Sequence, residues 1–185
     1  MKNKIQTLIT PDAIEERIGN LAAEISAYYG NEEILVLTVL NGAMIFTADL
    51  IRKITTPLHL DSIAVSSYEN NASTNKLTFR SQLKLPVANR KILLIDDILD
   101  TGNTAKHLID YLYGQGASEV KFCVLLDKQL EQERQISSAD FTGFKVPNRY
   151  VVGYGLDADE KYRNLPFIGI IWFFSCTGDI SMLYY

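Results

Sequence analysis

ILLIDDILDTGNT, residues 92–104, decides the fold, because it joins a buried strand to a helix through a short acidic turn. Residues 92–95 are all aliphatic, which is typical of a strand buried on both faces. Asp96 and Asp97 follow at the strand end, and apolar residues at helical spacing resume at Ala105. Such units build α/β proteins, whose ligands bind at the carboxyl ends of the parallel strands.

Helices and strands are predicted to alternate on both sides of this unit. Apolar spacing and end signals predict helices at residues 11–29, 44–54 and 105–113. Short apolar runs predict strands at residues 34–40, 58–66, 76–83, 91–95, 120–126, 150–154 and 167–173, and a mobile polar loop at residues 68–76. This order predicts an α/β fold with a central, mostly parallel, twisted sheet flanked by helices.

Composition narrows the class of partner. A chain of 185 residues with 47% hydrophobic residues fits a single domain. The net charge of -4 opposes non-specific binding to nucleic acid or to an anionic membrane, so we expect a small-molecule partner. No signal segment and no run long enough to span a bilayer is evident, which favours a cytoplasmic protein. Cys123 and Cys176 lie in apolar surroundings and are expected to be buried free thiols.

The acidic turn has the chemistry of an anion site. Backbone N–H groups at a helix start have no intrahelical partner, the helix dipole adds positive potential, and Thr101 and Thr104 add hydroxyl donors. Asp96 and Asp97 suit vicinal sugar hydroxyls or a hydrated Mg²⁺ ion. Together these groups predict a site for ribose 5-phosphate. The simpler alternative, that Asp100 and Thr101 only cap the helix, leaves the acidic pair unexplained.

Residues 92–104 resemble the phosphoribosyl-diphosphate signature of the type I phosphoribosyltransferases. Residues 39–43 (VLNGA) are similar to the pyrophosphate loop of that family, 66–68 (SSY) to the start of its flexible catalytic loop, and 125–128 (LLDK) to its base-contacting strand end. Residues 146–166 resemble the purine hood of the hypoxanthine-guanine phosphoribosyltransferases. The likeness extends from about residue 8 to about residue 170.

The resemblance implies a fold and an activity. The fold would be a single type I phosphoribosyltransferase domain over residues 1–185, with a small hood formed by the N-terminal segment and about residues 140–185. The activity would be that of a pentosyltransferase of purine salvage. It moves ribose 5-phosphate from phosphoribosyl diphosphate to hypoxanthine or guanine, giving IMP or GMP and pyrophosphate. Mg²⁺ as cofactor and a dimeric or tetrameric homo-oligomer are also implied.

The resemblance also assigns roles to residues. Asp100 would assist proton transfer at the purine, Ser67 and Tyr68 would begin the flexible loop, and residues 40–42 would offer backbone N–H groups, often through a non-proline cis peptide. The implied phosphoribosyl site comprises Asp96, Asp97, Asp100, Thr101, Gly102, Asn103 and Thr104, and the implied pyrophosphate site Leu40, Asn41, Gly42 and Arg163. The implied purine site comprises Lys128, Tyr150, Val151 and Asp157, and the implied metal site Asp96, Asp97 and Asp157.

Some positions depart from the family pattern or admit a simpler interpretation. Asn41 replaces a frequent lysine, and Asp96 a frequent glutamate. Arg163 could form only a surface ion pair with Asp159 or Glu160, and Tyr150 could be an ordinary strand aromatic. The tail, residues 172–185, is richer in aromatic residues than is usual in the family, and we expect it to pack on the core or in a subunit interface.

Three rival functions fit the sequence less well. A nucleotide-sensing regulator with the same fold would need a basic surface to bind RNA, which the net charge of -4 disfavours. A transferase for another base is disfavoured for adenine and pyrimidines by Lys128 and Tyr150, but the sequence does not separate hypoxanthine, guanine and xanthine. A phospho-acceptor domain fails to explain the DTGNT turn.

Overall fold

The computed structural model describes residues 4–67, 77–79, 83–130, 133–174 and 180–181. The predicted mobile loop at residues 68–76, Tyr68, Cys176 and most of the aromatic tail lie outside these residues. The described helices are α1 (Pro11–Tyr29), α2 (Met44–Ile51) and α3 (Asn103–Gly114). The described strands are β1 (Lys4–Ile9), β2 (Ile34–Leu40), β3 (Leu58–Ser67), β4 (Leu77–Phe79), β5 (Lys91–Leu99), β6 (Glu119–Gln129), β7 (Phe141–Pro147), β8 (Val151–Val152), β9 (Ile168–Phe174) and β10 (Ile180–Ser181).

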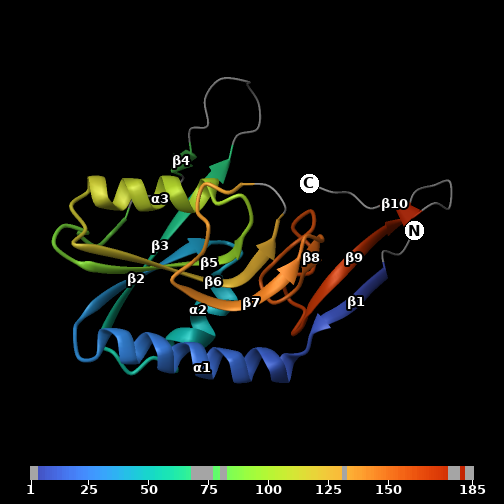
Figure 1. Ribbon diagram of the computed structural model, residues 1–185, viewed down its shortest axis with the longest axis horizontal. Coiled ribbons are helices and arrows are strands. Elements are labelled where there is room, and N and C mark those ends of the chain that lie inside the picture. The colour runs from blue at the N-terminus through green and yellow to red at the C-terminus, as the bar shows by residue number, and fades with distance from the viewer. Residues whose placement is uncertain (1–3, 68–76, 80–82, 131–132, 175–179, 182–185) are drawn as a thin grey trace.

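The larger sheet confirms the predicted α/β fold. Its strand order is β4-β3-β2-β5-β6-β7, in which the run β3-β2-β5-β6-β7 is parallel and β4 is antiparallel to β3. Helix α3 covers one face, and α1 and α2 cover the other (Figure 1). The predicted alternation of strands and helices therefore produces parallel pairing, as it does in other α/β proteins.

Two hydrophobic cores hold these layers together, one on each face of the sheet. β2 is buried along almost its whole length, and its side chains alternate between the cores: Ile34 and Val36 face α1 and α2, whereas Leu35 and Leu37 face α3. Burial of such a side chain contributes roughly 1.5–3 kcal/mol. A central strand with a continuous aliphatic sequence thus supports both layers at once.

A second, antiparallel sheet lies beside one end of the larger sheet (Figure 1). It is built on β9, which pairs with β1, β8 and β10. β1 and β7 were not predicted: β1 is mostly exposed, and β7 contains glycine and proline. The strand predicted at residues 150–154 is only β8, because Gly153 and Tyr154 have positive φ angles and turn the chain away.

Helix α1 illustrates how local sequence sets the element ends. The side chain of Thr10 accepts a hydrogen bond from the Ala13 N–H at 3.3 Å, and Pro11 occupies the first helical position. At the other end Gly30 adopts φ 57°, and its N–H donates a hydrogen bond to Ser26 O, which ends the helix. Among the described residues, no helix is long and apolar enough to cross a membrane.

Candidate active site

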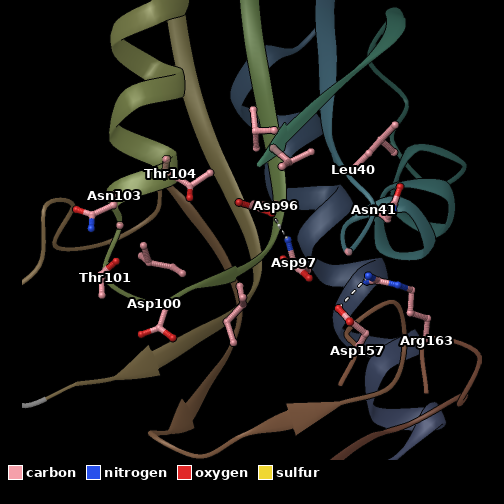
Figure 2. Close-up of a pocket in the computed structure, with 17 residues that line it drawn as sticks. Leu40, Asn41, Asp96, Asp97, Asp100, Thr101, Asn103, Thr104, Asp157 and Arg163 are labelled. Atoms are coloured by element: carbon pink, nitrogen blue, oxygen red, sulfur yellow. Dashed lines mark hydrogen bonds and ion pairs between the residues drawn. The ribbon is translucent and has the colours of Figure 1, made fainter. Parts of the chain in front are cut away.

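A pocket of about 440 Å³ opens at the carboxyl ends of the central strands β2, β3 and β5. Figure 2 shows Asp96 and Asp97 between two groups of residues, with Leu40 and Asn41 on one side and the start of α3 on the other. The lining comprises Val39, Leu40, Asn41, Gly42, Val65, Asp96, Asp97, Ile98, Leu99, Asp100, Thr101, Gly102, Asn103, Thr104, Ala105, Asp157 and Arg163. The structure therefore brings together all the residues predicted for sugar phosphate and pyrophosphate.

The acidic pair lies within β5 rather than after it. The strand was predicted to end at Ile95, but its ladder with β6 continues to Leu99, with Asp96 opposite Val124. Asp96 is 9% exposed and its Oδ1 accepts a hydrogen bond from the Asp97 N–H at 2.9 Å. Burial and the neighbouring Asp97 carboxylate raise the pKa of Asp96 well above its usual value. Hydroxyl donors or a cation would relieve this energetic cost.

Asp97 lies in contact with the loop after β2. A Cβ atom on Gly42 would lie 1.8 Å from Asp97 Oδ2, so glycine is needed here for the two chains to approach. Burial raises the pKa of Asp97, and the charge of Arg163 opposes this shift. The β2 loop, Asp97 and Arg163 thus share one electrostatic environment.

The start of α3 lines the pocket with residues 102–105. Gly102 precedes the helix with φ 81°, and no side chain of the described residues caps the helix start. The simpler alternative for the turn, in which Asp100 and Thr101 only cap α3, is therefore wrong. The first amides of the helix have no intrahelical partner and are available to an anion entering the pocket.

The loop after β2 carries the Leu40–Asn41 peptide in the cis form, as the family resemblance implies. Asn41 is exposed, and Gly42 O lies against Gly155. A Cβ on Gly155 would lie 2.2 Å from Gly42 O, and the φ angle of Gly155 is 105°. Sequence reasoning did not single out Gly155, although the spacing of Gly153 and Gly155 in VVGYGL was a signal for a tight turn.

Arg163 reaches the pocket from the segment after β8. It contacts Asp157 Oδ1 at 2.9 Å and Glu160 Oε2 at 2.8 Å, and it donates a hydrogen bond to Gly155 O at 2.8 Å. Figure 2 shows the ion pair with Asp157 facing the pocket. Arg163 forms the ion pair with Glu160 that the simpler interpretation predicted, but it also lines the pocket.

Lys128, which was predicted to bind the purine, contacts the pocket residue Asp100. Its Nζ lies 2.6 Å from Asp100 Oδ2, and its side chain is 10% exposed. Tyr150 and Val151 do not line the described pocket. Val151 is buried and pairs with Ile170. Burial raises the pKa of Tyr150, and the nearby Asp157 carboxylate adds to this shift. Ser67 ends β3 and pairs with Leu77.

The carboxylates of the pocket fit Mg²⁺ only together with substrate oxygens. Among the described residues, no group of three or more His, Cys, Asp or Glu side chains is placed to hold a metal ion. Asp96, Asp97 and Asp157 nevertheless line one pocket. Mg²⁺ is often held by one or two carboxylates, waters and substrate phosphates, and this arrangement suits that mode.

Comparisons with known proteins agree with the geometry of the pocket. The phosphoribosyl transferase domain model matches residues 7–159. A hypoxanthine-guanine phosphoribosyltransferase from Bacillus subtilis is 41% identical over 92% of this chain and 96% of its own length. A bifunctional TilS/HprT protein from Listeria innocua is 43% identical over 92% of this chain, which spans only 26% of that longer protein.

A solved structure gives the same result in three dimensions. A hypoxanthine-guanine phosphoribosyltransferase from Bacillus anthracis superposes with a TM-score of 0.84 and 37% identity, covering 91% of this chain and 99% of that one. The family match over residues 7–159 includes every described lining residue of the pocket except Arg163.

Proposed function

Because this chain belongs to the phosphoribosyltransferase family, and within it to the hypoxanthine-guanine phosphoribosyltransferases, we propose that its pocket transfers ribose 5-phosphate from phosphoribosyl diphosphate to a 6-oxopurine. The products are IMP or GMP and pyrophosphate. The observation that carries the proposal is the convergence, in one pocket, of the acidic pair, the uncapped start of α3 and Asp100, whose carboxylate binds Lys128 from outside the lining.

The sugar phosphate binds across the acidic pair and the start of α3. The amides of residues 102–104 and the hydroxyls of Thr101 and Thr104 donate to the 5-phosphate, and the helix dipole favours its charge. The carboxylates of Asp96 and Asp97 accept hydrogen bonds from the ribose hydroxyls. These contacts fix C1 of the ribose for attack, which is the main contribution that positioning can make to the rate.

The leaving pyrophosphate binds between the β2 loop and Arg163. The guanidinium group and the amides of residues 40–42 stabilise the charge that develops as the C1–oxygen bond breaks. Asp96, Asp97 or Asp157 would hold Mg²⁺ together with the substrate oxygens, and the ion would supply further positive charge there. Since Asn41 replaces a frequent lysine, Arg163 and the metal carry more of this task here.

The purine binds beside Asp100 and Lys128, under Tyr150 and the main chain of Val151. A lysine ammonium group has three N–H donors, so Lys128 can keep its contact with Asp100 and donate to a 6-oxo group. Asp100 assists proton transfer at the purine while its N9 attacks C1. An adenine amino group would face the ammonium with a donor instead of an acceptor, which is strongly unfavourable in a buried site.

The remaining family features complete the proposal. The second sheet, built on β9, forms part of the hood. We place the enzyme in the cytoplasm, as a dimer or tetramer. Light scattering of the purified protein tests the oligomeric state, and a monomer at assay concentrations would contradict it.

A base panel tests the proposed function. Purified protein is mixed with phosphoribosyl diphosphate, Mg²⁺ and hypoxanthine, guanine, xanthine or adenine, and nucleotide formation is followed for each base. We expect turnover with hypoxanthine or guanine and a rate with adenine that is on the order of 10⁴-fold lower. Lys128→Met should abolish most of this preference for 6-oxopurines. A nucleotide-sensing regulator would instead bind nucleotide without turning over any base, although nothing in the described structure favours it.

A further inference from the structure

A second segment lies against the outer side of the proposed phosphate cradle. The Gln135 N–H donates a hydrogen bond to Thr101 O at 2.9 Å. A Cβ on Gly102 would lie 2.7 Å from the Ile136 N, so the two backbones are in direct contact. Residues 133–139, which we call the backing segment, therefore fix the outer side of the turn that carries Thr101 and Gly102.

The backing segment is attached to β6 by a buried ion pair. Arg134 Nη1 lies 2.5 Å from Asp127 Oδ1, and the two side chains are only 9% and 6% exposed. Asp127 precedes Lys128 in β6, and consecutive strand residues point to opposite faces. Lys128 therefore contacts Asp100 on one side of the turn while Asp127 binds Arg134 on the other.

One side of the backing segment packs on the core, and its other side borders a cavity. Ile136 and Ala139 pack on the core beside α3. On its other side the segment borders a cavity of about 610 Å³, which is lined by Asp127, Arg134, Ser137, Ser138 and Lys145 among other residues. This side is not closely packed, so packing alone does not hold Gln135 in place. Its position therefore depends on the ion pair of its neighbour Arg134.

Charge burial makes this attachment specific. If one partner of a buried ion pair is removed, the other is left as an uncompensated buried charge and must move or draw in water. Loss of Asp127 would therefore release Arg134 toward solvent and draw the neighbouring Gln135 amide away from Thr101. The turn would then lose the hydrogen bond that holds its outer side.

We propose that the Asp127–Arg134 ion pair positions the 5-phosphate turn of the active site, by holding the backing segment against Thr101 and Gly102 without touching the substrate. This inference rests on the proposed function for the identity of the ligand, but its geometric part concerns the turn alone. Asp127 and Arg134 are thus positioning residues for the binding of phosphoribosyl diphosphate.

Steady-state kinetics of matched variants test this role. Asp127→Asn and Arg134→Gln each remove one charge of the pair, and Lys121→Gln is the control, because Lys121 lies on the same strand in a more exposed ion pair with Asp140. We expect the KM for phosphoribosyl diphosphate to rise by about 10- to 100-fold in the two pair variants, with a smaller change in kcat and in the purine KM. Lys121→Gln should leave all three constants unchanged.

A conservative variant separates positioning from general destabilisation. Arg134→Lys keeps the positive charge, so its KM for phosphoribosyl diphosphate should lie much closer to the wild-type value than that of Arg134→Gln. All assays are run well below the melting temperature of each variant. Equal KM values in the folded pair variants and the wild type would overturn the proposal, as would a uniform loss in kcat alone.

Two readouts that do not need turnover keep the inference separate from the proposed function. Calorimetry with ribose 5-phosphate should show weaker binding to Arg134→Gln than to the wild type. Hydrogen exchange should show faster exchange of the Gln135 amide and of the Lys106 amide, whose acceptor is Gly102 O, in that variant. Wild-type protein without transferase activity would refute the proposed function only, whereas unchanged exchange and unchanged ribose 5-phosphate affinity would refute the role of the ion pair.

Discussion

The carboxylate of Asp100 has two candidate tasks, because it lies in the phosphate turn and also 2.6 Å from Lys128 Nζ. If it assists proton transfer at the purine, Asp100→Asn should lower kcat by about 10²- to 10⁴-fold, the range of general acid–base catalysis, with little change in the affinity for phosphoribosyl diphosphate. Pre-steady-state kinetics and equilibrium binding measure the two effects separately. Equal losses in both would mean that Asp100 only positions the sugar phosphate.

Asp96 predicts a pH dependence of stability whose sign follows from its raised pKa. A carboxyl group whose pKa is higher in the folded state than in the unfolded state favours folding when protonated, and this contribution is lost as the pH rises through the folded-state pKa. At neutral pH, which lies above the unfolded-state pKa, the carboxyl group therefore costs stability. Asp96→Asn should raise the melting temperature at pH 7, because it removes this cost. Each tenfold difference in proton affinity between the folded and unfolded states corresponds to about 1.4 kcal/mol of unfolding free energy.

The same variant should lose this advantage in acid. As the pH falls toward the usual carboxylate pKa of about 4, the wild-type group is protonated in both states and the difference disappears. Thermal unfolding of both proteins between pH 4 and pH 8 checks the trend. An advantage of Asp96→Asn that was constant across this range would show that burial of the charge is not its cause.

Gly42 is expected to be needed for activity more than for folding. In Gly42→Ala the new methyl group would occupy the position of Asp97 Oδ2, but a carboxylate can rotate away. We expect a folded protein whose kcat/KM for phosphoribosyl diphosphate is reduced on the order of 100-fold, because Asp97 no longer faces the sugar. Gly114→Ala is a matched control, since nothing lies within 4 Å of a Cβ at that position. Similar activity in both variants would contradict the placement of Asp97.

At the scale of elements, Gly155 joins the segment after β8 to the loop after β2. Alanine there would meet Gly42 O at 2.2 Å with φ 105°, and neither backbone can give way as easily as a side chain. Gly155→Ala should therefore lower the free energy of unfolding by about 1–3 kcal/mol and also raise the KM for phosphoribosyl diphosphate. Chemical denaturation and kinetics measure the two effects. Gly19→Ala, in the open middle of α1, should instead be neutral or stabilising.

Local signals explain which elements the sequence could predict. Short, mostly apolar runs indicated β2 and β6, and the cap at Thr10 and the stop at Gly30 located α1. β1 and β7 escaped notice because they contain too few buried residues to give a pattern. The end of β5 was placed too early, since Asp96 and Asp97 are poor strand formers that the ladder with β6 keeps extended.

The candidate site was predictable to the extent that it is local in sequence. The turn at residues 96–104 carries the groups that we propose for the sugar and the phosphate, and the family resemblance added Arg163 and Lys128. The contact of Gly155 with Gly42 joins distant segments, and the ion pair of Arg134 with Asp127 spans seven residues across the end of β6, so no periodic pattern indicated them.

For the whole molecule, one end of the parallel sheet gathers the residues that we propose for the three parts of a transferase site. The carboxyl ends of β2, β5 and β6 bring residues 40–42, the acidic pair and Lys128 to neighbouring positions, because parallel strands end on the same side of the sheet. The segment after β8 adds Arg163 and Asp157 from the second sheet's side. Sugar, leaving group and purine are therefore expected to bind simultaneously.

The most direct test of this claim is the product stoichiometry of a single reaction. Wild-type protein is incubated with phosphoribosyl diphosphate, hypoxanthine and Mg²⁺, and IMP and pyrophosphate are both quantified, with a parallel sample containing excess EDTA. We predict equal amounts of IMP and pyrophosphate, and no product in EDTA. Pyrophosphate released without IMP, or no turnover with either hypoxanthine or guanine, would contradict the proposed transfer.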